Sequence, residues 1–237
     1  MTPTSTQEDR PVAVVTGASR GLGRALAAAL VEGGWHVVVD GRDPEVLAGA
    51  AQPWSGRATA VAGDVADREH RTALVRAAEA AGGAALLVNN ASELGPSPLP
   101  RLADHGLDDL VRVLEVDVVA PVGLFQQLLP QLQQRRGRVL NLSSDAAVQP
   151  YAGWGGYGGA KAALDQATRV LAVEHPELRV YAVDPGDLRT QLHQRAFPGE
   201  DISDRPLPES VVPALLRLVE ADLPSGRYVA ADLLAAP

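Results

Sequence analysis

Cysteine is absent from this chain of 237 residues, and its absence excludes disulfide bonds and zinc sites built from thiolates. The five histidines are scattered, without the close spacing of a metal-binding motif, so the sequence predicts no metal site. No apolar run approaches the ~20 residues that a membrane-spanning helix needs, and residues 1–10 lack the apolar centre of a signal peptide. We therefore expect a cytoplasmic protein with no membrane partner.

Positive charge is also scarce. The chain carries 21 Lys and Arg against 29 Asp and Glu, a formal net charge of −8, and it shows no basic stripe. A nucleic-acid partner is therefore not expected. The length suits one α/β domain with a sizeable core. We expect residues 11–237 to form this domain after a flexible tail at residues 1–10.

Short apolar segments alternate with segments of helical spacing along the whole chain. The predicted strands lie at residues 12–15, 35–39, 58–62, 85–88, 138–142, 180–183 and 227–229. This alternation predicts an α/β fold, with a doubly wound parallel sheet of about seven strands and helices on both of its faces.

Proline and glycine modify this pattern in two places. Pro121 and Pro130 fall within a long helical region at about residues 108–136, and we expect them to kink or interrupt it. Residues 186–208 are polar, contain proline and glycine, and exceed the length of most connections in compact domains. Such segments are usually functional lids or disordered, so we expect a substrate loop there.

A glycine-rich turn directly follows the first predicted strand. It reads Thr16-Gly17-Ala18-Ser19-Arg20-Gly21-Leu22-Gly23 and leads into the first predicted helix. Glycines let the backbone approach a pyrophosphate, and a helix N-terminus offers N–H groups and the positive end of a dipole. In this strand–turn–helix context, the turn predicts a dinucleotide site rather than a turn used only for packing.

Tyr157 and Lys161 stand four residues apart in a predicted helix and so share one of its faces. A nearby ammonium favours phenolate and lowers the pKa of a tyrosine, which is about 10 when free. This spacing is common by chance, but beside a dinucleotide site it predicts acid–base chemistry.

Six motifs in order make the chain resemble the short-chain dehydrogenase/reductase family over nearly its whole length. They are Thr16 to Gly23; Asp64-Val65; Asn89-Asn90-Ala91-Ser92, with Ser92 where the family has glycine; Ser144; Tyr157 with Lys161; and Pro185-Gly186 followed by Thr190. The resemblance implies a Rossmann-like fold. It also implies a cofactor site formed by Gly17, Ser19, Arg20, Gly21, Leu22, Gly23, Arg42, Asp64, Val65, Asn90, Ala91, Tyr157, Lys161, Pro185, Gly186, Leu188 and Thr190.

The resemblance further implies hydride transfer between a nicotinamide and a carbonyl or secondary alcohol of a small organic substrate. Tyr157 would donate a proton to the carbonyl oxygen during reduction. Lys161 would lower the pKa of Tyr157 and bind the nicotinamide ribose. Ser144 would hydrogen-bond the substrate oxygen and stabilise its developing charge.

At Asp117 the chain departs from the family pattern. The family has asparagine there, holding a water that connects the catalytic lysine to solvent. An aspartate could accept the same hydrogen bond, but it adds negative charge near the proton relay. We expect Asp117 to serve in a working catalytic site. The alternative is a catalytically weak or inactive NADP(H)-binding or redox-sensing protein of the same fold. A sugar-nucleotide epimerase ranks last, because such enzymes usually have another glycine spacing and a longer C-terminal region.

Two arginines favour NADP(H) over NAD(H). A 2′-phosphate needs a cationic partner, whereas an unmodified ribose is usually held by an acidic residue at the end of the second strand. By resemblance, that acidic position falls at Gly41, and Arg42 stands where NADP-binding members carry arginine. Arg20 adds a second cation. Asp40 is one residue early for the ribose role, so its side chain should point to the opposite face of the strand.

The resemblance places the substrate pocket beside Tyr157. Its candidate lining residues are Gln149, Trp154, Leu192 and Phe197. The aromatic rings could offer an apolar wall, but they could equally pack beneath a loop. Family members usually form dimers or tetramers, so we expect a homodimer or homotetramer.

Overall fold

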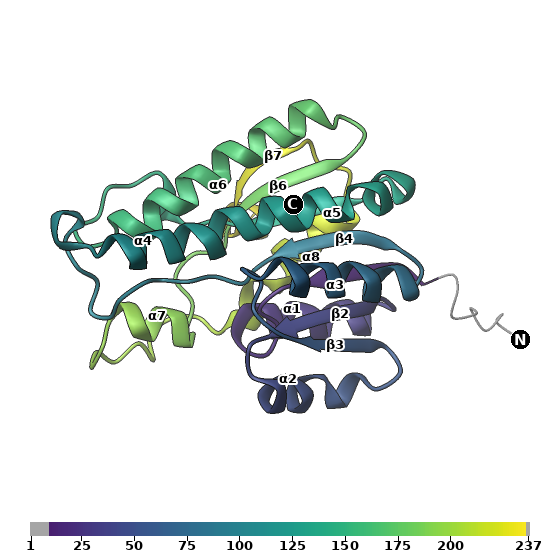
Figure 1. The fold of residues 1–237 in the computed structure, drawn as a ribbon, viewed down its shortest axis with the longest axis horizontal. Coiled ribbons are helices and arrows are strands. Elements are labelled where there is room, and N and C mark those ends of the chain that lie inside the picture. The colour runs from purple at the N-terminus through teal and green to yellow at the C-terminus, as the bar shows by residue number, and fades with distance from the viewer. Residues whose placement is uncertain (1–9, 236–237) are drawn as a thin grey trace, which may run out of the picture.

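Seven strands form one sheet at the centre of the computed structural model, which describes residues 10–235 (Figure 1). They are β1 (Val12–Val15), β2 (His36–Gly41), β3 (Ala58–Ala62), β4 (Ala84–Asn89), β5 (Arg138–Leu142), β6 (Arg179–Asp184) and β7 (Gly226–Val229). Their order across the sheet is β3-β2-β1-β4-β5-β6-β7, and each neighbouring pair is parallel. The predicted doubly wound α/β fold is confirmed. The predicted tail lies, apart from Arg10, outside the described residues.

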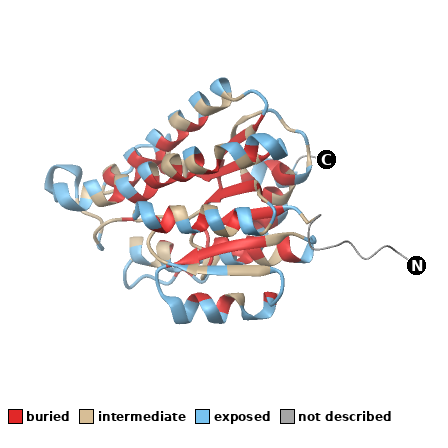
Figure 2. Ribbon diagram, turned by 45° about the vertical axis from the view of Figure 1, so that its right-hand side comes forward, coloured by how far each residue is buried: buried red, intermediate tan, exposed pale blue. Residues whose placement is uncertain are grey.

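Both faces of the sheet are apolar. Successive side chains of a strand point to opposite faces. Ala13 and Val15 of β1 accordingly pack into one buried cluster, whereas Val12 and Val14 pack into another. Because both faces are covered, the strands read as continuous apolar runs. Figure 2 shows the sheet as a buried layer between helices whose outer sides are exposed.

Helices cover the two faces. One face carries α1 (Gly21–Glu32), α8 (Val212–Glu220) and α9 (Ala230–Ala235). The other carries α3 (Arg68–Ala80), α5 (Ala120–Arg135) and α6 (Gly155–Glu174), and α2 (Pro44–Ala51) follows β2. α9, a short helix after the last strand, was not predicted from the sequence.

A π-helical turn interrupts the long helical region. α4 (Leu107–Leu114) leads into this turn, Glu115–Val119, and α5 follows it. Pro121 stands in the first turn of α5 and has no N–H to donate to the carbonyl of Asp117, four residues earlier. The expected interruption is thus found beside Pro121, whereas Pro130 lies inside α5 without ending it. The π turn carries Asp117 toward α6, against which it packs.

By length and composition, the helical stretch Leu107–Arg135 could cross a membrane, although the sequence analysis found no apolar run long enough to do so. Its most apolar window has a mean hydropathy of 1.3 and is 44% buried within the protein. Leu124, Leu128 and Leu132 of α5 are buried against the sheet. This packing identifies the α5 part as a core helix.

Candidate active site

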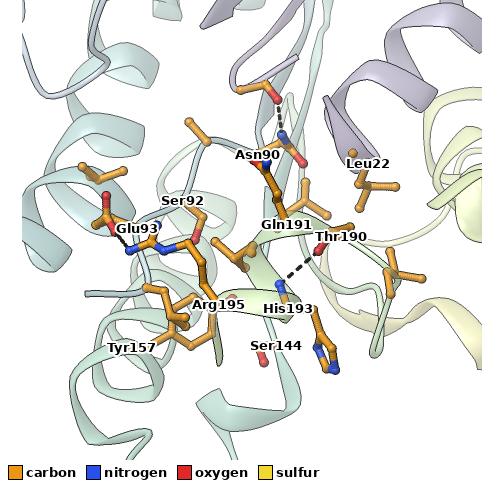
Figure 3. Close-up of a pocket in the computed structure, with 18 of the residues that line it drawn as sticks. Leu22, Asn90, Ser92, Glu93, Ser144, Tyr157, Thr190, Gln191, His193 and Arg195 are labelled. Atoms are coloured by element: carbon orange, nitrogen blue, oxygen red, sulfur yellow. Dashed lines mark hydrogen bonds and ion pairs between the residues drawn. The ribbon is translucent and has the colours of Figure 1, made fainter. Parts of the chain in front are cut away.

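A cavity of about 630 Å³ lies at the carboxyl ends of the strands (Figure 3). The glycine turn after β1, the loops after β2, β4, β5 and β6, and the start of α6 all contribute to its lining. The sheet order reverses between β1 and β4, and open α/β sheets bind ligands outside the strand ends at such a point. Residues 10–235 contain no group of three or more acidic and histidine side chains placed to hold a metal ion.

The glycine turn leaves a helix start open to the cavity. Gly17 and Gly21 adopt positive φ angles of 65° and 54°, which a glycine tolerates best. The residue before α1 is Arg20, and its side chain does not cap the helix. The first N–H groups of α1 therefore lack a side-chain partner, and a bound anion would satisfy them. This arrangement fits the pyrophosphate of a dinucleotide.

Gly23 stabilises the turn on the side that faces away from the cavity. It does not line the cavity, although the sequence assigned it to the cofactor site. A Cβ atom at this position would lie 2.4 Å from Nδ2 of Asn90 and 2.6 Å from the carbonyl oxygen of Gly17. That same Nδ2 donates to the carbonyl oxygens of Thr16 and Gly17. Gly23 thus leaves room for the amide that ties the loop after β4 to the glycine turn.

Gly23→Ala is expected to lower the free energy of unfolding by about 1–3 kcal/mol, the usual cost of overpacking a tight contact. It should also weaken dinucleotide binding, because the turn must shift. Urea unfolding and a fluorescence titration with NADPH measure the two effects. Gly49→Ala is the matched control: it lies in α2 with nothing within 4 Å of the added Cβ. The control should be as stable as the parent or more so, by up to about 1 kcal/mol. Parent-like stability and binding in Gly23→Ala would contradict this account.

The Asp40 side chain stabilises the glycine turn by a hydrogen bond. Its Oδ1 accepts a hydrogen bond from the Gly17 N–H at 2.5 Å, and its Oδ2 lies 3.1 Å from Nε2 of His70. Burial raises the pKa of Asp40, against the lowering effect of the His70 and Gly17 hydrogen bonds. Because both of its oxygens are engaged inside the protein, Asp40 has none free for a ribose.

Ser144, Tyr157 and Lys161 line the same cavity as the glycine turn. Tyr157 and Lys161 lie one turn apart on α6, and the Lys161 Nζ is 5.4 Å from the centre of the Tyr157 ring. Nζ also donates to the Leu142 carbonyl at 2.9 Å. The Ser144 Oγ donates to Asp145 at 3.0 Å and accepts from the Ala146 N–H.

Asp117 lies behind this group, fully buried and outside the cavity lining. Its Oδ1 is 2.8 Å from the Lys161 Nζ, so the two side chains form a direct ion pair. Oδ1 also accepts from Ser92 Oγ at 2.5 Å, and Oδ2 accepts from the Glu93 N–H at 2.9 Å. The sequence predicted an acceptor near the relay, but no spacing in it indicated that this acceptor would pair with Lys161 itself.

The pKa of Tyr157 lies above its usual value, opposite to the effect expected of Lys161 alone. Burial is the main cause, Lys161 lowers the pKa, and the negative charge of Asp117 raises it again. Burial also acts to lower the pKa of Lys161, but Asp117 and the Tyr157 phenol raise it above the ordinary value. Lys161 therefore remains an ammonium, and part of its charge is balanced by Asp117.

At the outer end of the cavity, each expected charged group already has a partner. The Arg42 side chain is 65% exposed and lies 3.6 Å from Glu93, and Arg20 hydrogen-bonds Gln191. Asp64 forms an ion pair with Arg112 at 2.5 Å. Burial tends to raise the pKa of Asp64, but the Ala66 N–H and Arg112 hold it below its usual value. Arg112 lines the cavity from α4 and was not predicted from the sequence.

The end of the cavity beside Tyr157, where we expect the substrate, is aromatic. Trp154 has its ring centre 5.8 Å from that of Tyr157 and 6.0 Å from that of Phe197. Leu192 lines the same wall from α7 (Gln191–Ala196), a short helix within the expected substrate loop. Gln149 is exposed and does not line the cavity, because the chain after β5 winds into a short 3₁₀ turn before it. The structure therefore places Gln149 outside the cavity, apart from Trp154, Leu192 and Phe197.

Arg227 was also missed. From β7 it reaches Asp165 of α6 at 3.0 Å and Asp184 at the end of β6 at 3.2 Å. It also donates to the Ser144 carbonyl at 3.0 Å. Arg227 thus joins three segments of the site that lie far apart in the sequence. No local spacing signals such a contact, because its partners are 43 to 83 residues away.

Comparison with known proteins places this chain among enzymes. A family model described as short chain dehydrogenase matches residues 11–201. The human mitochondrial dehydrogenase/reductase SDR family member 2 is 37% identical over 198 residues, covering 80% of this chain and 69% of that protein. Serine 3-dehydrogenase of Rhizobium radiobacter is 35% identical over 183 residues, covering 76% and 72%. A short-chain dehydrogenase of Shigella flexneri, solved in complex with NADP, superposes with a TM-score of 0.85 at 27% identity, covering 95% of this chain and 100% of that one.

Proposed function

This chain belongs to the short-chain dehydrogenase/reductase family and is an oxidoreductase acting on small molecules, and we propose that it transfers hydride between NADP(H) and a carbonyl or secondary alcohol. One observation carries the proposal: the glycine turn and the Tyr157–Lys161 pair line one cavity. The turn fits a dinucleotide, and the pair fits proton transfer to an oxygen beside it.

The side chains have distinct roles in the proposed reduction. NADPH, when bound, would supply the hydride that reaches the carbonyl carbon. Tyr157 gives its phenolic proton to the carbonyl oxygen, and the Lys161 ammonium stabilises the phenolate that is left. Ser144 turns its hydroxyl from Asp145 to the same carbonyl oxygen, whose charge grows in the transition state.

A panel of ketones, quinones and aldehydes tests the function, with NADPH consumption followed by its absorbance. Turnover of at least one compound by the parent chain is expected. If NADPH binds and no compound is reduced, the proposed activity is wrong and the NADP(H)-binding or redox-sensing alternative is favoured. The ion pair between Asp117 and Lys161 is the observation that favours this alternative, because it takes up part of the charge on Lys161.

The proposed preference for NADP(H), which carries a 2′-phosphate, is based on the residues at the end of β2. Gly41 offers no acidic side chain, and a Cβ there would lie 3.0 Å from the Ser19 side chain. Asp40 is occupied by the glycine turn and Asp43 caps α2 with its side chain, which leaves Arg42 as the exposed cation after the strand. Its partner Glu93 is also held by Arg195, so Arg42 can leave it without stranding that carboxylate. These contacts support NADP(H) over NAD(H).

Arg42→Ala is expected to weaken NADPH binding about tenfold and NADH binding much less, because a charge-assisted hydrogen bond to the 2′-phosphate is lost. Fluorescence titration with the two cofactors gives the ratio directly. Arg24→Ala, on an exposed position of α1 outside the cavity lining, is the matched control. Equal weakening of both cofactors in Arg42→Ala would overturn the NADP(H) assignment.

We further propose that residues 186–208 act as a lid over the substrate. α7 is held to the loop after β4 by Arg195, which donates to Glu93 at 3.1 Å and to the Gly95 carbonyl at 2.8 Å. Opening of α7 would release both bonds and expose the aromatic wall. Faster amide exchange in Arg195→Ala, confined to α7, would support this; unchanged exchange would contradict it.

A homodimer or homotetramer is proposed through the outer faces of α4 and α6. These helices lie side by side (Figure 1) and expose Leu107, Val111 and Val173. Light scattering in solution should give a multiple of the chain mass, and a monomer mass would rule this out. A cytoplasmic location stays a prediction, to be checked by fractionation of cells that express the chain.

A further inference from the structure

Two positions at which this chain departs from its family pattern are in direct contact. Ser92 stands where the Asn-Asn-Ala-Gly motif ends in glycine, and Asp117 stands where the family has asparagine. They are 25 residues apart in the sequence, yet Ser92 Oγ donates to Asp117 Oδ1 at 2.5 Å. A glycine at position 92 could not make this bond.

Asp117 needs that donor. It is fully buried, and a buried carboxylate is costly unless it is paired and hydrogen-bonded. Its bonds come from Lys161, the Glu93 N–H and Ser92. Of the three donors, only Ser92 is a departure from the family pattern.

Ser92 also contacts the proton-transferring group. Its hydroxyl lines the same cavity as the Tyr157 phenol and acts to lower the pKa of that phenol, against burial and the charge of Asp117, which raise it. Figure 3 shows Ser92 and Tyr157 on the same side of the cavity. A serine hydroxyl has a single hydrogen. When this hydrogen is donated to Asp117, the Ser92 oxygen can accept a hydrogen bond from a neutral phenol. When it points toward Tyr157 instead, it stabilises phenolate.

We propose that Ser92 is a positioning residue that works as one unit with Asp117, sharing its hydroxyl hydrogen between the Asp117 carboxylate and the Tyr157 oxygen. The shared hydrogen lets an aspartate stand beside the phenol without holding it permanently in the neutral form. This inference rests on the proposed oxidoreductase function, since it concerns how the phenol gives and regains its proton.

A double-mutant cycle tests the unit: Ser92→Gly, Asp117→Asn, and both together, which restores the family pattern. Ser92→Gly alone should lower kcat about 10- to 100-fold, since a buried charge loses a donor. In the Asp117→Asn background, the same change should cost less than about threefold. Ser92→Thr, which keeps a hydroxyl, should restore most of the rate, and Ser55→Gly, at a distant exposed turn, should leave it unchanged. Equal factors in both backgrounds would overturn the inference.

A second measurement does not require turnover. The ionisation of Tyr157 can be followed by ultraviolet difference spectra against Tyr157→Phe. Asp117→Asn removes a negative charge and should shift this titration to lower pH, whereas Ser92→Gly removes a donor to phenolate and should shift it to higher pH. The variants leave the other titratable groups around Tyr157 in place: Lys161 on α6, Asp184 at the end of β6, Glu93 after β4, Asp145 after β5, and His193 and Arg195 on α7.

The two measurements separate the possible failures. If the parent reduces no carbonyl but the titration shifts as stated, the proposed function fails and the Ser92–Asp117 unit stands. If the parent is active and neither the cycle nor the titration shows coupling, the unit is wrong and the function stands. If neither Ser92→Gly nor Asp117→Asn shifts the pH at which Tyr157 ionises, the unit is contradicted whether or not the parent is active.

Discussion

Tyr157→Phe is expected to lower kcat for carbonyl reduction roughly 10²- to 10⁴-fold, the usual contribution of a positioned general acid. The change removes one oxygen from a side chain that is only 7% exposed and keeps the ring, so its packing against Leu94 and Ala146 remains. NADPH affinity should change little, because the glycine turn is untouched. Stopped-flow or steady-state NADPH oxidation, with a fluorescence titration of NADPH, measures both quantities.

Tyr228→Phe is the matched control for this prediction. Its hydroxyl donates to the Pro224 carbonyl at the far end of β7, and Tyr228 does not line the cavity. Parent-like kcat is expected for this variant. A Tyr157→Phe protein that keeps a tenth or more of the parent kcat would show that another group supplies the proton.

Arg227→Leu is expected to lower the free energy of unfolding by about 3–5 kcal/mol, because it leaves buried carboxylates without their partner. The side chains of Asp165 and Asp184 are 3% and 7% exposed, and both face the Arg227 guanidinium. The same substitution frees the Ser144 carbonyl, so kcat should fall as well. Urea unfolding gives the stability change.

Arg179→Leu is the control, because it breaks an ion pair of similar length whose acidic partner is exposed to solvent. Its partner Asp222 is 73% exposed, and an exposed pair contributes about 1 kcal/mol or less. The triple variant Arg227→Leu/Asp165→Asn/Asp184→Asn removes the buried charges together and should recover part of the lost stability. If Arg227→Leu costs no more than Arg179→Leu, the three-segment network does not stabilise the fold.

The sequence predicted the architecture well because the relevant signals are local. The five inner strands, β1, β2, β4, β5 and β6, are short and mostly apolar segments that are buried on both faces of the sheet, so they could be recognised without an alternating pattern. The glycine turn could be placed because its function requires a strand before it and a helix after it. Gly17 and Gly21 indeed adopt the positive φ angles that such a turn uses.

The site was predicted less completely, since several contacts depend on side-chain direction. Gln149 and Leu192 were both assigned to the pocket from their segments, but a 3₁₀ turn leaves Gln149 outside while α7 brings Leu192 in. Arg112 and Arg227 were missed because their partners are distant in the chain. The missing N–H of Pro121 was visible in the sequence, but the π turn beside it was not.

The sequence alone determined the family pattern, the parallel sheet and the residue types available for proton transfer, because each of these can be recognised from residues that lie close together in the chain. Only the tertiary structure decided how those residues act on one another. Ser92, Asp117 and Lys161 come from three segments, and the direct ion pair and the short Ser92 bond exist because the π turn, α6 and the loop after β4 pack together. Electrostatic effects depend on distance and burial, neither of which a linear spacing contains.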